Sequence, residues 1–168
     1  MHALVPRTST VASMTAKLPP LHHVGLIVSD FSAAAADFER RWGVETEDVM
    51  DLTWSEAVYD GTPSPFSARY GFLRSGASAL ELVQPLSGRS PYADFLEANG
   101  GDGIHHLAYV VDDIDAHLRQ ISDATGAPAE IQLDSPLPGN GRFTYVKNAA
   151  HGTVVELIEL SEEQRQQM

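Results

Sequence analysis

Two glutamates and two histidines occupy positions where apolar residues would be expected. Glu81 and Glu156 each lie in the middle of a short apolar run. A carboxylate inside a buried strand is strongly unfavourable unless it is paired with, or bound to, a cation. His23 and His106 each begin a segment rich in apolar and β-branched residues, which is typical of a buried strand. These four side chains are therefore candidates for a shared cation site.

Imidazole nitrogens and carboxylate oxygens together suit a divalent ion of intermediate hardness. Two histidines and two glutamates leave about two positions of an octahedral shell open to water or substrate oxygens. Cobalt, manganese, nickel, iron(II) and zinc fit this donor set, whereas magnesium fits less well. Two alternatives stay open, because a strand histidine can be a hydrogen-bonded core residue and a strand glutamate can face solvent. We expect one divalent metal ion, held by His23, Glu81, His106 and Glu156.

An internal repeat relates these four positions. Residues 22–31 can be laid over residues 105–114 at an offset of 83, and both segments start with a pair of histidines. The two copies also end alike, since residues 80–83 resemble residues 155–158 at an offset of 75. Agreement at both ends, in the same order, indicates a duplicated structural unit.

Strand alternation assigns the members of each histidine pair to opposite faces of the sheet. We expect His23 and His106 to face the interior. His22 and His105 are then expected on the opposite face, either packed in the core or facing outward. If the two copies pair about a pseudo-twofold axis, two imidazoles and two carboxylates meet in a central cleft.

Each copy has the pattern of a strand, an amphipathic helix and three further strands. The expected helices run from Asp30 or Ser32 to Trp42, from Pro91 to Leu96 with a stop at Asn99-Gly100, and from Asp112 or Asp113 to Gly126. The expected strands, besides those that follow the histidine pairs, are Ala68–Arg74, Ala79–Val83, Ala129–Leu133, Phe143–Lys147, Val154–Glu159 and one within Val49–Tyr59. Phe38 and Trp42 are expected in the core. Asp60–Ser67 and Pro136–Arg142 contain prolines and glycines and are expected to be loops.

We therefore predict an α+β fold of two paired βαβββ modules that form a cupped mixed sheet around the metal site. A length of 168 residues fits one such domain. The expected parts are module one at about 21–86, a linker helix at 90–99 and module two at about 104–160, together a single domain over 21–160. Residues 1–20 are expected to be a disordered tail or the remnant of a cleavable tag, and residues 161–168 a C-terminal tail.

Composition excludes several classes of function. The chain has 11 basic and 23 acidic residues, a net charge of −12. An acidic surface repels phosphate backbones and anionic lipids, so we expect neither a nucleic-acid nor a membrane partner. The chain has no cysteine, which excludes disulfides, thiolate ligands and a cysteine nucleophile. This composition is compatible with the cytoplasmic location that we expect.

Three stretches of the sequence resemble the vicinal-oxygen-chelate superfamily, which includes glyoxalase I, extradiol dioxygenases, bleomycin-resistance proteins and methylmalonyl-CoA epimerases. They are His22–Gly25, Leu80–Leu96 with its Pro-Leu, Ser-Pro and Phe-Leu pairs, and Gly103–Ala108 followed by Val111–Ile114. The second stretch is the most specific, because glyoxalase I does not usually contain it. The sequence therefore resembles the methylmalonyl-CoA epimerases most closely, over about Leu21 to Leu160.

The resemblance implies a fold, a site and a chemistry. Members of the superfamily chelate a substrate through vicinal oxygens, which stabilises an enolate-like intermediate, and they are often dimeric. The metal ligands of the family match His23, Glu81, His106 and Glu156, and Glu156 would also act as the catalytic base. The resemblance thus implies a metal-dependent epimerase or isomerase that removes a proton next to a carbonyl. Its partners would be a small-molecule substrate, with an acyl-CoA as one class, and a second copy of the chain in a homodimer.

The sequence departs from the epimerases before the first hairpin. The epimerases have a second glutamate where this chain has Tyr70, and the region Asp48–Arg69 is longer than theirs. We expect Tyr70 and Arg142 to contact the substrate, and Trp54 to lie either in a pocket wall or in simple packing. The departure leaves three alternatives open. They are a glyoxalase I-type lyase, another enzyme of the superfamily acting on a hydroxyketone or natural product, and a non-catalytic drug-binding protein.

Overall fold

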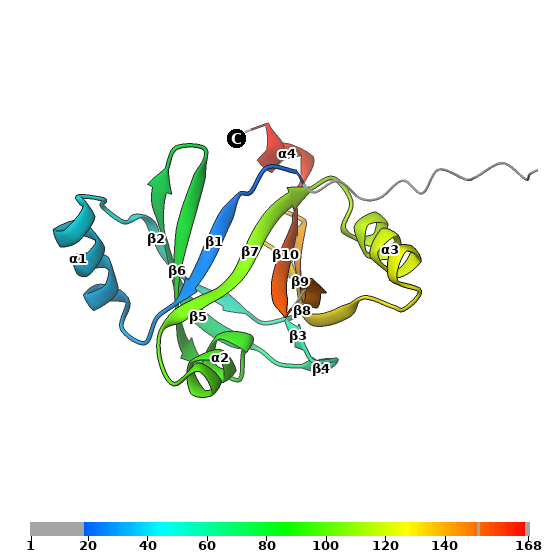
Figure 1. The fold of residues 1–168 in the computed structure, drawn as a ribbon, viewed down its shortest axis with the longest axis horizontal. Coiled ribbons are helices and arrows are strands. Elements are labelled where there is room, and N and C mark those ends of the chain that lie inside the picture. The colour runs from blue at the N-terminus through cyan, green and yellow to red at the C-terminus, as the bar shows by residue number, and fades with distance from the viewer. Residues whose placement is uncertain (1–18, 151, 167–168) are drawn as a thin grey trace, which may run out of the picture.

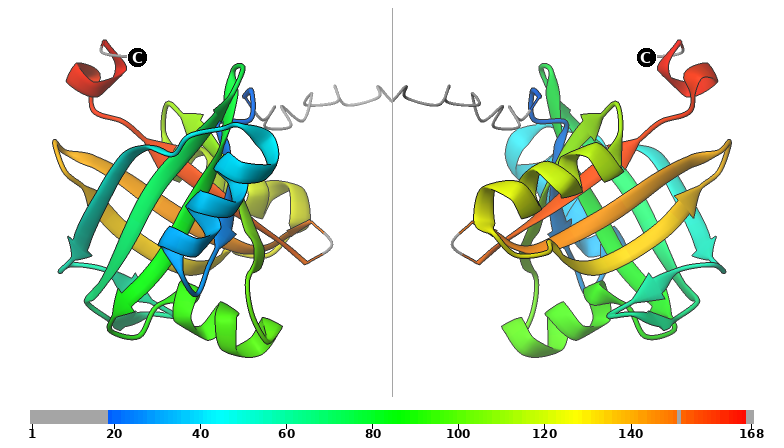
Figure 2. Two further views of the ribbon diagram at one scale, coloured as in Figure 1. Left: turned by 90° about the vertical axis from the view of Figure 1, so that its left-hand side faces the viewer. Right: turned by 90° about the vertical axis from the view of Figure 1, so that its right-hand side faces the viewer.

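The computed structural model describes residues 19–150 and 152–166. In this part of the chain, ten strands form one mixed sheet that curls around a central interior (Figures 1 and 2). The strands are β1 (His23–Ile27), β2 (Glu47–Trp54), β3 (Val58–Tyr59), β4 (Thr62–Pro63), β5 (Phe66–Ser75), β6 (Ser78–Ser87), β7 (Gly103–Val111), β8 (Glu130–Leu137), β9 (Gly141–Ala150) and β10 (Thr153–Glu159). The helices are α1 (Phe31–Trp42), α2 (Pro91–Asn99), α3 (Ile114–Thr125) and α4 (Glu162–Arg165). None of the helices in the described ranges is long and apolar enough to cross a membrane.

The strand order confirms the predicted fold class of two paired βαβββ modules. The order is β2-β5-β6-β1-β7-β10-β9-β8-β3-β4. In the first module β1 pairs in parallel with β6, and in the second β7 pairs in parallel with β10. The two modules join where β1 and β7 pair in antiparallel fashion at the centre of the sheet. Helices α1 and α3 cover the outer faces of the first and second modules (Figure 2).

Helix α1 begins and ends as the sequence predicts, but its last residue is not in the core. Asp30 caps the helix by accepting a hydrogen bond from the backbone N–H of Ala33 at 3.0 Å, and Gly43 ends it with a φ of 66°. Phe31 and Phe38 pack against the outer face of the sheet. Trp42 is 73% exposed, so its predicted core position is wrong. The apolar stripe continues into a last turn that has no strand to pack against (Figure 1).

The two predicted loops are largely paired into the sheet, which corrects the sequence prediction. Strands β3 and β4 form a small hairpin, and β3 crosses from the first module to pair with β8 of the second. Pro63 is tolerated there because β4 is an edge strand with no further neighbour in the described residues. In the second loop β8 extends to Leu137 and β9 begins at Gly141. Only a tight turn remains, in which Gly139 and Asn140 have φ angles of 81° and 67°.

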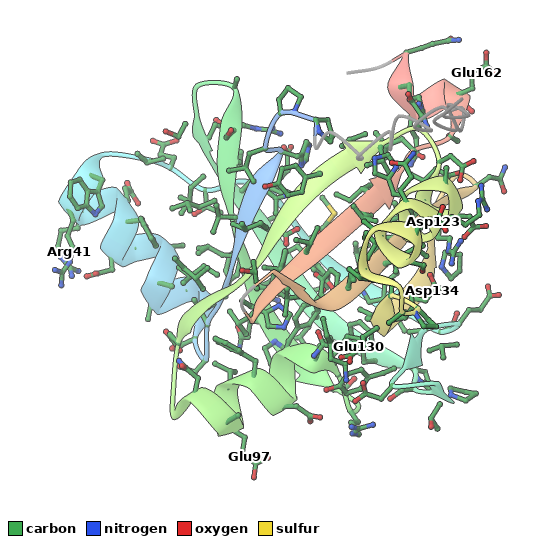
Figure 3. All side chains as sticks on the ribbon, turned by 45° about the vertical axis from the view of Figure 1, so that its right-hand side comes forward. Arg41, Glu97, Asp123, Glu130, Asp134 and Glu162 are labelled. Carbon is green, nitrogen blue, oxygen red and sulfur yellow. The ribbon has the colours of Figure 1, made fainter. Side chains whose placement is uncertain are left out.

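The two ends of the chain differ in how far the structure describes them. Residues 1–18 of the predicted N-terminal tail lie outside the described residues, as do residues 167–168. The predicted C-terminal tail contains the short helix α4, which Ser161 caps in a capping box with Gln164. Charged side chains such as Arg41, Glu97 and Glu162 point outward from the sheet (Figure 3).

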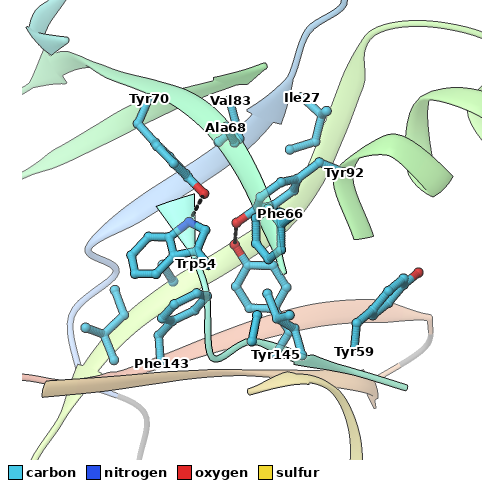
Figure 4. Close-up of a cluster of buried hydrophobic side chains, with 14 residues drawn as sticks. Ile27, Trp54, Tyr59, Phe66, Ala68, Tyr70, Val83, Tyr92, Phe143 and Tyr145 are labelled. Carbon is cyan, nitrogen blue, oxygen red and sulfur yellow. Dashed lines mark hydrogen bonds between the residues drawn. The ribbon is translucent and has the colours of Figure 1, made fainter. Parts of the chain in front are cut away.

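The interior of the curled sheet is filled mainly by aromatic side chains. Trp54, Tyr70, Tyr92, Phe143 and Tyr145 all belong to one buried cluster that joins the two modules (Figure 4). Their rings meet mostly edge to face, as quadrupolar rings prefer. This cluster forms the surroundings in which the polar residues of the central strands must be accommodated.

Candidate metal centre

The four predicted ligand side chains converge in the interior. The Nε2 atoms of His23 and His106 lie 3.2 Å apart. Oε2 of Glu156 lies 3.0 Å from Nε2 of His23 and 3.4 Å from Nε2 of His106. Oε2 of Glu81 lies 3.4 and 3.5 Å from the same two nitrogens. All four side chains are buried, with no more than 7% of any of these residues exposed.

The register of the four central strands produces this convergence. His23, Glu81, His106 and Glu156 come from β1, β6, β7 and β10, which are neighbours in the order β6-β1-β7-β10. Each module therefore contributes one histidine and one glutamate, on either side of the antiparallel β1–β7 junction. Because side chains alternate along a strand, the residues on either side of Glu81 and Glu156 point to the outer face, where they pack under α1 and α3. The pseudo-twofold arrangement inferred from the repeat is thus present in the structure.

Gly25 is a functional position that the sequence analysis did not single out. It lies opposite His106 in the β1–β7 pairing. A Cβ atom at this position would lie 1.9 Å from Cε1 of the His106 ring, much closer than any real contact. The imidazole of His106 therefore lies directly over the backbone of β1. The available sequence signal was a glycine inside a strand, which often marks a close approach of this kind.

Both histidine pairs are hydrogen-bonded, and neither pair is divided between opposite faces as strand alternation predicts, because His22 precedes β1 and lines the same cavity as His23. Nδ1 of His22 lies 2.8 Å from Nδ1 of His23, and Nδ1 of His105 lies 3.0 Å from Nδ1 of His106. His105 was predicted on the face opposite His106, and this is wrong. The β1–β7 register shifts so that Gly25 pairs with His106 and the next residue of β1 pairs with Ile104, which leaves His105 in a bulge. Its ring therefore also turns inward, against the rings of Tyr92, Phe95 and Tyr145.

Burial and charge determine the protonation of these histidines. Burial, together with the neighbouring ligand imidazole, lowers the pKa of both His22 and His105, the latter to about 3. A neutral ring at these positions can accept a hydrogen from Nδ1 of the ligand histidine, which leaves Nε2 of that histidine with a lone pair. Burial also lowers the pKa of His23, but the carboxylates of Glu81 and Glu156 outweigh it and raise the pKa to about 10. The pKa of Glu81 is raised by burial, but the nearby imidazoles lower it overall.

The residues fit a divalent metal ion. One ligand atom each from His23, Glu81 and His106 lies within 4.8 Å of the others. Oε2 of Glu156 is buried beside these atoms, and its nearest partners are the imidazole nitrogens of His23 and His106 at 3.0 and 3.4 Å. Metal–ligand bonds of about 2.0–2.2 Å place neighbouring octahedral donors about 3 Å apart, close to the separations observed between these atoms. An inward-facing set of two imidazole nitrogens and two carboxylates is therefore suited to a metal of the first transition series.

The two predicted substrate contacts differ in their positions. Tyr70 lines the cavity beside the four ligands, and its hydroxyl accepts a hydrogen bond from Nε1 of Trp54 at 2.7 Å. Trp54 also lines this cavity, so it lies in a pocket wall, one of the two positions that the sequence left open for it. Arg142 is not among the residues that line the cavity. It forms ion pairs with Asp134 at 2.7 Å and Asp115 at 2.8 Å instead.

The curled sheet of two paired modules with this central cluster defines the class of paired βαβββ proteins. The model of the Glyoxalase/Bleomycin resistance protein/Dioxygenase superfamily matches residues 22–145, and the chain belongs to this superfamily.

Individual relatives within the superfamily are methylmalonyl-CoA epimerases. The chain is 35% identical over 104 residues to the ethylmalonyl-CoA/methylmalonyl-CoA epimerase of Cereibacter sphaeroides, which covers 62% of this chain and 69% of that one. It is also 35% identical over 102 residues to the human mitochondrial methylmalonyl-CoA epimerase, covering 60% of this chain and about half, 51%, of the human protein. The structure of the methylmalonyl-CoA epimerase from Mycobacterium tuberculosis has a similar fold, with a TM-score of 0.65 at 23% identity, covering 92% and 99% of the two chains.

Metal binding should become tighter as the pH rises. Since the pKa of His23 is raised to about 10 without metal, this imidazole holds a proton at neutral pH that a metal must displace. Below pH 10 the proton competes with the metal, so the association constant should rise about tenfold per pH unit between pH 6.5 and 8.5. Isothermal titration calorimetry in buffers of different ionisation enthalpy should show release of about one proton per metal at pH 7.5. A pH-independent affinity would contradict this assignment of the proton.

Proposed function

We propose that this protein is a metal-dependent epimerase or isomerase that removes and returns a proton at a carbon next to a carbonyl group. The observation that supports the proposal most directly is the convergence of His23, Glu81, His106 and Glu156 beside a cavity. Three of these residues, His23, Glu81 and Glu156, line the cavity itself. The relatives at 35% identity support the same chemistry, because they are named for the epimerisation of acyl-CoA thioesters.

Deprotonation next to a carbonyl is slow in water because the resulting enolate is high in energy. A divalent ion held by the four ligands would act as a Lewis acid and stabilise negative charge that develops on the carbonyl oxygen. The buried surroundings exclude water, which strengthens every electrostatic interaction in the site. Two vicinal oxygens of the substrate would fill the two positions that the protein leaves open.

Glu156 is the proposed catalytic base. Its Oε2 lies 3.0 Å from Nε2 of His23, and its side chain borders the cavity where substrate must enter. A carboxylate beside a bound substrate carbon can take up the α-proton and return it to either the same or a neighbouring position. Glu81 and the two histidines would then act as ligands alone, with His22 and His105 orienting the histidine rings.

Tyr70 is the proposed hydrogen-bond donor to the substrate. Burial raises the pKa of its phenol, so the group keeps its proton at neutral pH. Because its oxygen already accepts a hydrogen bond from Trp54, its own proton remains to be donated. Tyr70 occupies the position at which the epimerases have a second glutamate, and its neutral phenol would donate a hydrogen bond to a substrate oxygen while keeping its proton.

The proposal is tested by solvent deuterium exchange. Metal-loaded protein should incorporate deuterium at the α-carbon of an acyl-CoA or hydroxyketone in D2O, as measured by mass spectrometry. Methylmalonyl-CoA, ethylmalonyl-CoA and a set of 2-hydroxyketones should be compared. Protein treated with a chelator is the control and should lose the exchange, which should return when cobalt or manganese is added back. Absence of exchange across all substrates in the fully loaded protein would overturn the proposal.

A further inference from the structure

The cavity beside the four ligands has a wall that is almost entirely apolar. Its volume is about 220 Å³, and His23, Glu81 and Glu156 are among the residues that line it. Both modules contribute to the rest of the wall, which includes Leu52, Trp54, Tyr70, Phe72, Phe143 and Ile158. Trp54 comes from the end of β2 and Phe143 from the start of β9, and their ring centroids lie 4.9 Å apart at an interplanar angle of 63°.

The polar atoms of this wall are paired with one another. Nε1 of Trp54 donates to the hydroxyl of Tyr70 at 2.7 Å, and the hydroxyls of Tyr92 and Tyr145 lie 2.8 Å apart (Figure 4). Gln164, the amide group at the cavity, accepts a hydrogen bond from the backbone of Ser161 and donates one to the carbonyl of Pro138. Away from the four ligands, the wall therefore presents mainly ring faces, ring edges and aliphatic groups.

Away from the four ligands, the wall has no lysine or arginine among the described residues that could hold an anionic substituent. Among the described residues that line the cavity, none is a lysine or an arginine, and the carboxylates are Glu81 and Glu156. A carboxylate of the substrate placed against this wall would lose its hydration without gaining a partner. An apolar group of the same size would instead gain from its removal from water. The charges in the wall therefore disfavour a substrate that carries an anionic substituent in addition to its chelating oxygens.

The size and ring geometry favour an aromatic substituent. An apolar cavity of about 150 Å³ is enough to bind benzene, so about 220 Å³ accommodates a phenyl group with several further atoms. The ring of Trp54 meets that of Tyr70 at an interplanar angle of 87°, with centroids 6.2 Å apart. A ring of the substrate can extend this edge-to-face arrangement. Such a contact contributes binding free energy in addition to that from the buried apolar area.

We infer that the substrate carries an aryl or similarly bulky apolar group next to its chelating oxygens, and that Trp54 determines this preference. The inference rests on the proposed function, since it assumes that a metal chelates the substrate at the four ligands. Trp54 lies in the region Asp48–Arg69, where the sequence departs from the epimerases. This chain would therefore prefer a larger and less polar substituent than the short side chain of methylmalonyl-CoA.

Two hydroxamates test the inference without any turnover. Benzohydroxamate and acetohydroxamate chelate a divalent ion through the same two vicinal oxygens and differ only in a phenyl or a methyl group. Isothermal titration calorimetry on the manganese-loaded full chain measures the affinity ratio of benzohydroxamate to acetohydroxamate. This ratio should be about 30-fold larger than the same ratio for manganese free in solution. A 30-fold ratio is about 2 kcal/mol, roughly half of what complete burial of five additional CH2-sized groups would give.

Variants locate the preference in the cavity. Val110→Phe adds a ring to the cavity wall and should remove most of the preference while acetohydroxamate binding stays unchanged. Val49→Phe makes the same substitution at a position that is 54% exposed and outside the cavity, and it should keep the preference. Trp54→Ala should also reduce the preference. Val110→Phe keeps the test valid if Trp54→Ala does not fold, because it leaves every ring of the aromatic cluster in place.

The outcomes separate this inference from the proposed function. Equal affinity for the two hydroxamates in the unmodified protein would overturn the inference and leave the metal centre intact. Retention of the full preference in Val110→Phe would also overturn it. Failure of both hydroxamates to bind to protein that contains manganese would overturn the chelating site itself, and the inference with it.

Discussion

Glu156→Gln should reduce the turnover number by roughly 10³-fold at saturating metal while leaving metal in the protein. The substitution preserves the size of the side chain and one ligand oxygen, but it removes the group that would take up the proton. Loss of a positioned general base typically costs 10²- to 10⁴-fold in rate. Steady-state epimerisation or deuterium exchange, with the metal content measured by elemental analysis of the same sample, checks this expectation.

Two matched variants distinguish a base from a ligand. Glu159→Gln lies three residues further along β10, where the side chain accepts a hydrogen bond from the backbone of Ile114 at 2.9 Å. An amide oxygen can accept the same bond, so this variant should retain full activity. Glu81→Gln should weaken metal binding but recover much of its turnover when metal is added in excess. Equal losses in Glu81→Gln and Glu156→Gln at saturating metal would contradict the assignment of Glu156 as the base.

Gly25→Ala should weaken metal binding by roughly 10- to 100-fold without removing any ligand. The new methyl group would overlap the His106 ring, whose Cε1 would lie 1.9 Å from it, so the imidazole must move away from the other three ligands. Changes that misplace a metal ligand in this way typically reduce affinity or activity by this amount. Competition with a fluorescent chelator measures the metal affinity, and circular dichroism verifies that the variant is folded.

Gly71→Ala is the matched control for this prediction. Gly71 lies in β5, and a Cβ atom there would approach Cζ of Phe31 to 2.6 Å, on the outer face beneath α1. Overlap of this kind in a packed core costs about 1–3 kcal/mol of stability. We therefore expect a lower melting temperature but an unchanged metal affinity for Gly71→Ala. A similar loss of metal affinity in both variants would show that general destabilisation, not the position of His106, is responsible.

The sequence was sufficient to predict the fold class and the clustering of the four candidate ligands. The repeat was informative because it marked equivalent positions in two modules. Alternation did not separate His22 from His23, because His22 precedes β1 and lines the same cavity. Alternation failed at His105, because a bulge adds one residue to β7 and turns two neighbouring rings the same way. No periodicity in the sequence reveals such an insertion, since it depends on how two strands distant in the chain align.

Other errors arose where long-range pairing outweighed local preference. The proline and glycine content of Asp60–Ser67 indicated a loop, yet part of this segment pairs as an edge strand. An edge strand tolerates proline because the backbone N–H groups on its outer side have no partner strand. Arg142 was expected to contact the substrate, but it does not line the cavity and forms ion pairs with Asp115 and Asp134. The space filled by Trp54 and Phe143 depends on contacts between the two modules, which no local pattern in either module encodes.

The residues that would perform the chemistry and those that shape the cavity differ in their relation to the duplication. All four ligand positions belong to the duplicated strands at the centre of the sheet, and each has a counterpart in the other half. Trp54 belongs to β2, the outermost strand of the first half, just before the hairpin that breaks the symmetry by pairing with β8 of the second half. A substitution in this peripheral segment can change which molecules enter without moving a ligand atom. Single substitutions in this segment could therefore change the substrate preference of such a protein while its metal ligands stay in place.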